Sequence, residues 1–334
     1  MNKSKIIKVF SVMIIIGILL IICGFILEPD VLKYSMYYDD NGFHFSKDIF
    51  ELQDFNTFEE WDRFNWNLLV FFGKKGNDIK QFFKDEFEYD TSGIEEIEIE
   101  SVTTSVKIIE DDIYNDGKIH FSHQAYGEKI INEKSGDIIK IKTKKSSPFI
   151  DKASGVLIIY IPKLSPLDYS IKTVSGNVSI NLDRPLEEVE EIEIETVSGQ
   201  VEINTQIAEK VDSNTISGNL SVNVYDVKEI KLETTSGNVE VIAKRSVGKL
   251  DIGTISGESA ITVKDIEEVE IDSASGNIDI NIIENIASLY LESKSGNVYM
   301  DSVELGKSYT KKYGKGTINA KTLSGDIKLE NRDN

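Results

Sequence analysis

Cysteine and histidine are scarce in this sequence, whose 334 residues include one cysteine and three histidines. The single Cys23 lies inside an apolar segment, so one chain cannot form an internal disulfide and must be stabilised by other contacts. His120 and His123 stand three residues apart, which on a strand turns the two rings to opposite faces. With no cysteine or carboxylate at a metal-ligand spacing, the sequence predicts no zinc site.

The signature motifs of catalysis are also missing. The sequence contains no G-x-S-x-G, no P-loop and no H-E-x-x-H pattern. From residue 173 onward it has only three arginines, whereas β-helical polysaccharide lyases use clustered aspartates with lysine or arginine. The G-G-x-G-x-D repeat of calcium-binding β-rolls is absent as well. We therefore expect no catalytic residue, no cofactor and no metal.

Positive charge is scarce too, since 57 acidic residues outnumber 37 basic ones and give a formal net charge of −20. Three lysines, Lys3, Lys5 and Lys8, precede the first apolar segment, and without these 3 charges the remainder carries −23. An acidic body repels phosphates, so we expect no nucleic-acid partner. It also disfavours direct adsorption to anionic lipid or wall polymer unless a cation lies between.

The sequence does contain one short motif that recurs as far as residue 325, and its first copy is Thr-Val-Ser-Gly-Asn-Val at residues 173–178. Its eight Ser-Gly pairs are 23, 19, 19, 20, 19, 20 and 29 residues apart. A fixed period near 20 is the signature of stacked repeats. The structural corners are Ser175 and Gly176, Ser198 and Gly199, Ser217 and Gly218, Ser236 and Gly237, Ser256 and Gly257, Ser275 and Gly276, Ser295 and Gly296, and Ser324 and Gly325.

Each corner lies between two runs in which aliphatic and charged residues alternate, the pattern of half-buried strands. We expect the glycine to supply a positive φ and the serine to hydrogen-bond the turn backbone. One repeat cannot bury its own apolar face, but stacked repeats can. The sequence therefore predicts an all-β, single-stranded β-helix-like solenoid. The inward side chains of the coil at Ser198 should be Ile192, Ile194, Val201 and Ile203.

Aligned positions of the repeats should form ladders along the stack at about 4.8 Å per coil. Stacked amides in the second ladder could then bond to the copies above and below. The hydroxyl ladder is Thr173, Thr196, Thr215, Thr234, Thr254, Ser273, Ser293 and Thr322. The amide ladder is Asn177, Gln200, Asn219, Asn238, Glu258, Asn277, Asn297 and Asp326.

These repeats resemble the bacterial putative-adhesin domains, also known as toast-rack or β-strand-repeat domains, which include LiaG-like cell-envelope proteins. Residues 157–163, directly before the first full repeat, resemble the approach strand of that family, and the likeness covers residues 94–330. The resemblance implies the repeat fold. It implies no activity, because the family has no agreed one.

The N-terminus carries a segment, residues 9–27, that is 19 residues long and uncharged. That length spans a bilayer as a helix, and the lysines before it place the N-terminus in the cytoplasm and the body outside. A cleaved signal peptide would need small residues at its cleavage site, but residues 26–29 are Ile-Leu-Glu-Pro. A lipoprotein signal would need a small residue before Cys23, where Ile22 stands. We expect a retained signal-anchor, with lipidation at Cys23 as the alternative.

The region that follows is rich in aromatic residues, including Trp61 and Trp66. Residues 57–60 form a capping box that predicts an amphipathic helix. A second short helix is expected around Ile79, Phe82, Phe83 and Phe87. We expect this helical pair to cover the first coil, since an open edge strand invites aggregation. The alternative is a helix that binds the membrane surface or a partner.

The sequence thus divides into four parts: a cytoplasmic tip and membrane anchor (1–29), an aromatic-rich helical cap (30–90), an irregular β region (91–172) and the regular solenoid (173–334). In the irregular region, Thr103 and Thr104 stand in the place of Ser-Gly. The last coil carries a long insertion, residues 306–316, whose lysines Lys307, Lys311, Lys312 and Lys315 are expected to be solvated, with a local anion contact as the alternative.

Two functions fit these features. The first is a non-catalytic, adhesin-like scaffold of the cell envelope that presents a rigid β-surface to an envelope protein, such as a membrane sensor, or to a wall component. The second is a carbohydrate-acting enzyme with its site in a groove of the solenoid. Outward Asp, Glu and Arg gathered in one groove would favour the enzyme. The sequence does not determine the oligomeric state.

Overall fold

The computed structural model describes residues 36–39, 42–45 and 82–331, with short gaps at 112–113, 115, 147–152, 164, 166, 183–188, 284–287 and 313–314. Every regular element in these ranges is a strand, which confirms the all-β prediction. Within them no helix is long and apolar enough to cross a membrane. The predicted anchor and the helix after the capping box lie outside the described residues. A small hairpin pairs β1 (Met36–Asp39) with β2 (Gly42–Phe45).

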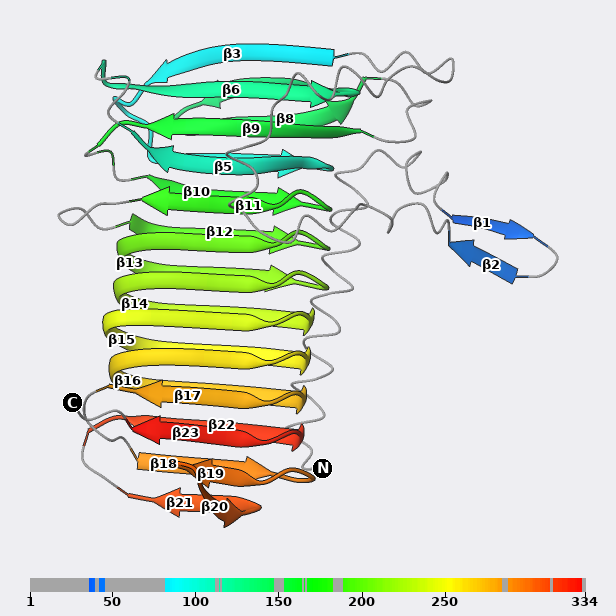
Figure 1. The fold of residues 1–334 in the computed structure, drawn as a ribbon. Helices are drawn as coiled ribbons and strands as arrows, with labels where there is room; N and C mark the ends of the chain where they lie inside the picture. Colours follow the sequence, from blue (N-terminus) through cyan, green and yellow to red (C-terminus); the bar gives the residue numbers. More distant parts are fainter. Residues whose placement is uncertain are drawn as a thin grey trace.

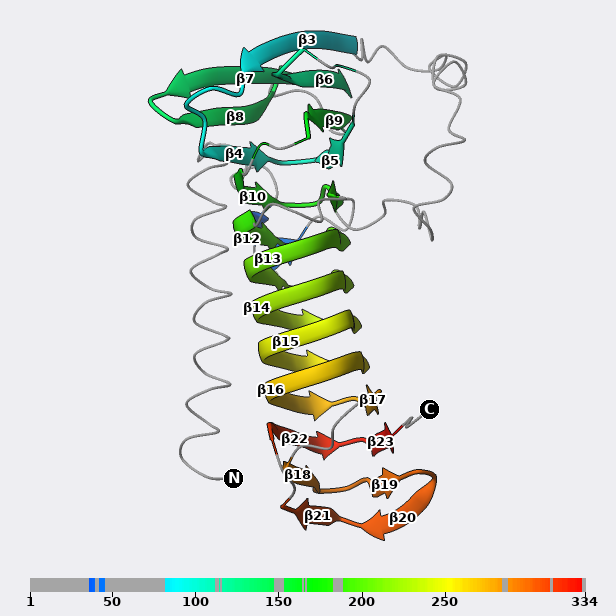
Figure 2. The same cartoon turned by 90° about the vertical axis from the view of Figure 1, so that its left-hand side faces the viewer.

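The repeats coil as the sequence predicts, and one coil comprises a strand, a Ser-Gly corner, a second strand and a bend (Figures 1 and 2). In the coil at Ser198, β12 (Val189–Thr196) reaches the corner and the first half of β13 (Val201–Thr215) leaves it. The second half of β13 begins the next coil. Three further long strands repeat this path: β14 (Leu220–Ser236), β15 (Val239–Ser256) and β16 (Ser259–Ser275).

Two parallel sheets result, which we call the incoming face, before the corners, and the outgoing face, after them. The pairing keeps equivalent positions in register: Ile192 pairs with Val211, and Val201 pairs with Leu220. The first full repeat contributes β10 (Asp168–Thr173) to the incoming face and β11 (Val178–Leu182) to the outgoing face. The outgoing face continues into β17 (Ile278–Ile282).

The hydrophobic core is the space between the two faces. The four predicted inward residues of the coil at Ser198 are each no more than 2% exposed. They belong to one continuous cluster that runs from Ile94 to Leu329. Each buried aliphatic side chain contributes about 1.5–3 kcal/mol, but only when neighbouring coils cover it.

The order of the coils differs from the order of the repeats in the sequence. The last repeat, β22 (Thr317–Ser324) and β23 (Ile327–Asn331), lies between the two repeats that precede it in the chain (Figure 1). Its neighbours are β16 and β17 on one side, and β18 (Ser288–Ser293) and β19 (Val298–Met300) on the other. In the hydroxyl ladder Thr322 therefore stands between Ser273 and Ser293.

The opposite end of the stack has the same device. The degenerate repeat, β4 (Glu96–Ser101) and β5 (Thr104–Glu110), pairs with β10 and β11 on its inner side. Its outer neighbours are β8 (Ile138–Lys145) and β9 (Ser154–Ile161), which come later in the chain. At both ends, therefore, the order of the coils in the stack differs from their order in the sequence.

Antiparallel strands close the two ends. On the N-terminal side β6 (Lys118–Tyr126) pairs with β9, β3 (Phe82–Asp90) pairs with β6, and β7 (Glu128–Ser135) pairs with β8. On the other side β20 (Val303–Gly306) pairs with β19, and β21 (Ser308–Lys311) pairs with β18.

The prediction of a second helix around Phe82, Phe83 and Phe87 is wrong, because these residues lie in β3. From Phe83 onward alternate residues turn inward, which is the period of a strand. The ring of Phe87 stacks on Phe121 of β6, with centroids 4.7 Å apart. The described part of the cap is thus a strand held by cross-strand aromatic contacts.

Removal of residues 218–236 should leave a shorter folded stack, because it joins Ser217 to Gly237 and so connects equivalent corner positions. We expect β-type circular dichroism and a cooperative melt at a somewhat lower temperature. Removal of half a coil, residues 218–227, is the control, since it would connect a corner to a bend and should prevent folding. Equal unfolding of both variants would contradict the solenoid interpretation.

Candidate functional site

The corner glycines do not share the positive φ that the sequence led us to expect. Among the eight, only Gly257 (155°) and Gly325 (147°) have a φ in that region. The expectation is wrong for Gly218 and Gly237, among others. Another constraint must therefore select glycine at these corners.

That constraint is the close approach of successive corners. A Cβ on Gly218 would lie 1.8 Å from the carbonyl oxygen of Gly199, and a Cβ on Gly199 would lie 2.0 Å from that of Gly176. At all eight corners the distance to the carbonyl oxygen of the neighbouring coil is between 1.8 and 2.2 Å. Each carbonyl occupies the space of the next Cβ, so the corners form a glycine column along the stack.

The hydroxyl groups around the corners are used in bonds that hold the backbone. In three coils the ladder threonine accepts a hydrogen bond, 3.0 Å long, from the N–H of the corner glycine: Thr173 from Gly176, Thr196 from Gly199 and Thr215 from Gly218. Three corner serines donate to a carbonyl of the preceding coil: Ser175 to Val102, Ser198 to Val174 and Ser217 to Val197. These serines act as links between coils.

The amide ladder bonds in a different way from the expected side-chain stacking. The Oδ1 atom of Asn219 accepts the backbone N–H of Asn238 at 2.9 Å, and Asn238 does the same for Glu258 at 3.0 Å. Asn177, Asn277 and Asp326 make the equivalent bond. Across the described ladder, only Asn and Asp act as acceptors. Gln200 and Glu258 are one methylene longer and take no part as acceptors.

At the N-terminal end the column stops at Thr104, which stands in the glycine place. Its side chain fits because Gly155 lies opposite it in β9. The hydroxyls of Thr103 and Thr104 donate to the two oxygens of Glu128, at 2.7 and 2.5 Å. Glu128 is fully buried. A carboxylate therefore terminates this end of the column.

At the opposite end a lysine terminates the column. The Nζ atom of Lys307 donates to the carbonyl oxygens of Gly296 and Ser295, at 2.6 and 2.9 Å. Lys307 was expected in a solvated loop, but it binds the last corner of the stack. The column thus has opposite charges at its ends, matching carbonyl oxygens that all lie toward the Lys307 end.

The two neighbouring histidines lie on opposite faces of β6, as predicted. His123 is fully buried, and its Nδ1 lies 3.3 Å from Asp85. Its Nε2 has no hydrogen-bond partner among the described residues. Burial lowers the pKa of His123, although the carboxylates of Asp85 and Glu128 oppose this shift.

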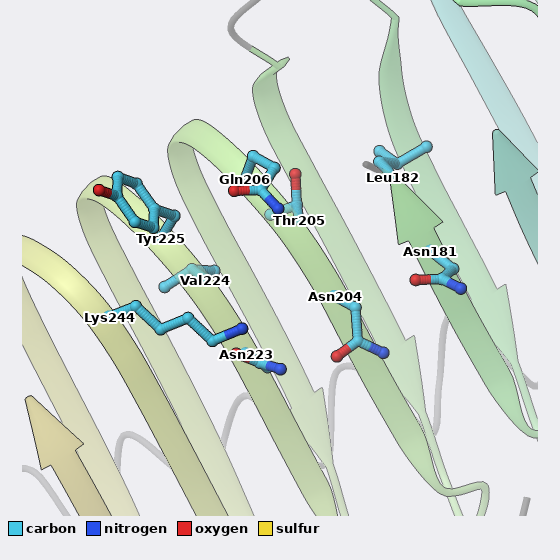
Figure 3. A pocket seen from close by; sticks show the side chains of 9 residues that line it. All are labelled: Asn181, Leu182, Asn204, Thr205, Gln206, Asn223, Val224, Tyr225 and Lys244. Carbon is cyan, nitrogen blue, oxygen red and sulfur yellow. The ribbon is translucent and has the colours of Figure 1, made fainter. Parts of the chain in front are cut away.

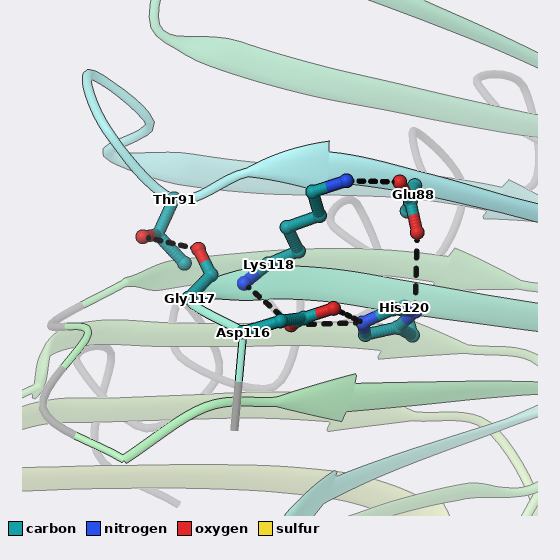
Figure 4. A network of polar contacts seen from close by, with 6 residues as sticks. All are labelled: Glu88, Thr91, Asp116, Gly117, Lys118 and His120. Carbon is teal, nitrogen blue, oxygen red and sulfur yellow. Dashed lines mark hydrogen bonds and ion pairs between the residues drawn. The ribbon is translucent and has the colours of Figure 1, made fainter. Parts of the chain in front are cut away.

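His120 lies on the outer side of β6, between two carboxylates (Figure 4). Its Nε2 lies 2.9 Å from Asp116, and its Nδ1 lies 3.7 Å from Glu88. The hydrogen bond from His120 lowers the pKa of Asp116. The three ligand-type groups approach within 4.8 Å of one another. No pattern in the sequence indicates this cluster, because Glu88 belongs to another strand.

The cluster is better suited to joining strands than to holding a metal. The carboxylates lie at different ring nitrogens, whereas one ion would bind a single nitrogen along its lone pair. Lys118 also forms an ion pair with Glu88, which an ion would have to displace. We therefore interpret the contacts of Glu88, Asp116 and His120 as links between β3 and the start of β6.

A groove of about 240 Å³ lies on the outgoing face, where the strands approach their bends (Figure 3). No sequence motif predicts this groove. Its lining comprises Asn181, Leu182, Asn204, Thr205, Gln206, Asn223, Val224, Tyr225 and Lys244. It contains amides, a phenol and one ammonium group, but no carboxylate and no arginine.

A second hollow, of about 320 Å³, lies on the incoming face near the C-terminal end of the stack. Glu268, Glu270, Tyr290 and Lys321 contribute side chains to it. Its two glutamates lie two residues apart on one strand, and it contains no aspartate or arginine. Neither hollow has the gathered Asp, Glu and Arg that would favour an enzyme.

Comparison with known proteins gives one family match: the Toastrack DUF4097 model matches residues 94–330. No curated protein matches the chain.

Several solved structures are similar over most of the chain. A putative adhesin from Parabacteroides distasonis ATCC 8503 is 13% identical, with a TM-score of 0.46, over 76% of this chain and 98% of that one. A putative lipid binding protein from the same organism is 16% identical, with a TM-score of 0.46, over 74% and 96%. A putative adhesin from Bacteroides fragilis NCTC 9343 is 12% identical, with a TM-score of 0.38, over 75% and 97%. At these values the likenesses support no argument about function.

The free energy of unfolding should decrease as the pH is lowered, and part of this decrease should come from His123. Its folded pKa lies below its unfolded value, so the unfolded state gains the proton first as the pH falls below about 6.5. We expect His123→Gln to lose less stability than the wild type between about pH 7.5 and 5.5, measured by urea unfolding. His120→Gln, on the outer side of the same strand, is the control. An unchanged pH dependence in His123→Gln would contradict this account.

The glycine column predicts that even one methyl group is too large at a corner. Gly218→Ala should destabilise the fold by about 1–3 kcal/mol or more, since the new Cβ would overlap a backbone carbonyl. Gly253→Ala is the matched control, because its Cβ would meet only the Glu233 side chain at 3.7 Å. Urea unfolding of the two variants tests this. Similar stabilities would mean that the corners can separate to admit a side chain.

Proposed function

Since this chain belongs to the Toastrack DUF4097 family, we propose that it is a non-catalytic β-repeat scaffold that binds a partner of the bacterial cell envelope. The observation that carries the proposal is the glycine column. It holds the coils in one register and so presents two broad, regular faces. Three of the eight corner serines donate hydrogen bonds to neighbouring coils, which is a structural role.

The proposal includes a place for the protein. The uncharged segment 9–27, with lysines before it, supports a single membrane anchor with the N-terminus in the cytoplasm. The body would then lie outside the membrane. Its partner would be another envelope protein, such as a membrane sensor, or a component of the cell wall. The adhesin-like family is the support for binding rather than catalysis.

The alternative, a carbohydrate-acting enzyme, has less support. Glycosidases need two carboxyl groups placed on either side of the scissile bond. The groove on the outgoing face has no carboxylate in its lining. The two glutamates of the other hollow, Glu268 and Glu270, lie side by side on one strand, an arrangement that leaves both on the same side of a bound sugar.

Protease treatment of cells tests the proposed topology. Protease added to wall-stripped protoplasts should digest the body, whereas a cytoplasmic marker protein should remain intact. Cys23→Ala distinguishes the two anchors by apparent mass: a signal-anchored protein should be unchanged, whereas a lipoprotein should lose its lipid and the cleavage before Cys23 and run as a larger precursor. Full protection of the body in unbroken protoplasts would overturn the extracytoplasmic placement.

A further inference from the structure

The two faces of the stack differ in charge. On the incoming face, the outward positions from β12 to β16 hold ten acidic and three basic residues; on the outgoing face, those from β11 to β16 hold two of each. The incoming set is Glu191, Glu193, Glu195, Lys210, Asp212, Glu229, Lys231, Glu233, Lys249, Asp251, Glu268, Glu270 and Asp272. The outgoing set is Glu202, Glu240, Lys244 and Lys264. The negative charge is thus concentrated on one face, and the other is polar and nearly neutral.

A row of three amides crosses the neutral face inside the groove (Figure 3). Asn181 pairs in register with Asn204, and Asn204 pairs with Asn223, so the side chains recur at about 4.8 Å. The Nδ2 atom of Asn204 donates to Glu202 at 2.8 Å, which fixes the orientation of the central amide. Each amide offers a donor and an acceptor to a ligand.

Thr205, the residue after the central amide, turns to the opposite side of the strand, into the core between the two faces. Thr205 is 5% exposed, and its Oγ1 has no hydrogen-bond partner among the described residues. Its equivalents in neighbouring coils are apolar: Leu182, Val224, Ala243, Val263 and Ile282. A buried hydroxyl without a hydrogen-bond partner is destabilising. Because this hydroxyl faces the core, the groups that the groove offers to a ligand are the outward amides of Asn181, Asn204 and Asn223.

The rim of the groove adds an exposed aromatic ring. Tyr225 is 43% exposed and lies at the bend of β14, beside the amide row. Lys244 extends across the strands toward Asn223 (Figure 3). Tyrosine combines an apolar ring face with a hydroxyl, which suits a ligand that has both apolar and polar surfaces.

We infer that this groove is a binding site for a neutral oligosaccharide. Sugar hydroxyls are donors and acceptors, which match the row of Asn181, Asn204 and Asn223, and the C–H face of a sugar ring can pack on Tyr225. The regular spacing of the amides suits a polymer whose hydroxyls recur along its length. The near-neutral face provides no field that would attract a strongly charged polymer. The inference rests on the proposed binding function and specifies its ligand.

Titration of the full chain, purified in a sugar-free detergent, tests this inference. The probes are the neutral hexasaccharides of cellulose, mannan and chitin, with hexagalacturonate as an anionic comparison. We expect at least one neutral probe to bind, and Tyr225→Ala and Asn223→Ala to weaken that binding by about tenfold or more. Two matched controls should bind as the wild type does. Tyr290→Ala removes an exposed tyrosine from the opposite, incoming face, and Asn281→Ala removes an outward asparagine of β17.

Thr205→Val provides a second, independent measurement. It replaces the core-facing hydroxyl by a methyl group of similar size, so the variant should melt at a higher temperature and bind the neutral probe as the wild type does. Several-fold weaker binding by Thr205→Val would show that the ligand reaches the core side of the strands and would overturn the placement of the site on the outer surface.

The remaining outcomes are also decisive. Binding of none of the probes, binding of hexagalacturonate alone, or binding unchanged by Tyr225→Ala and Asn223→Ala would overturn the inference. Capture of an envelope protein from crosslinked membranes by Tyr225→Ala, with no saccharide binding in the wild type, would leave the scaffold proposal standing and remove only the saccharide site. Failure of both assays would count against the proposed function itself.

Discussion

The contact of one corner glycine with the next is the constraint on which the rest of the structure depends. Because each carbonyl oxygen occupies the space where the next coil would place a Cβ, the corners stack as closely as backbone allows. That contact sets the spacing and register of both faces. The aliphatic core, the bond from Asn219 to Asn238 and the row of amides in the groove all follow from coils held at the same level.

The two ends of the stack have edges that no further coil covers. Polar side chains bind the ends of the glycine column, and additional strands cover the edges of the sheets. A run of carbonyls that all lie toward one end leaves that end rich in acceptors, and the ammonium of Lys307 binds the last of them. At the other end Thr104 replaces glycine, and the buried Glu128 accepts a hydrogen bond from the Thr104 hydroxyl. Antiparallel strands then cover the edges that would otherwise recruit another chain.

Much of this fold could be predicted from the sequence, because alternation and a period near 20 report directly on strands and stacking. The inward residues, such as Ile192 and Val201, follow from that alternation alone. The role of glycine was misjudged because positive φ and close backbone approach select the same residue. The position of the last coil was not visible, since equivalent repeats can pair in any order. The groove was missed because the row of Asn181, Asn204 and Asn223 is visible only when the strands after the corners are aligned.

The inward return of β22 and β23 has a consequence for how the protein is made. The repeat containing β18 and β19 is synthesised before them, but its place in the stack is against their outer side. It therefore has no finished surface to dock on until β22 and β23 have left the ribosome and, for an exported chain, crossed the membrane. The stack can grow coil by coil only as far as β17, and its end closes in one late step. A chain that stops early lacks the layer that joins its last two repeats, so incomplete molecules are marked by a loose end that proteases can recognise.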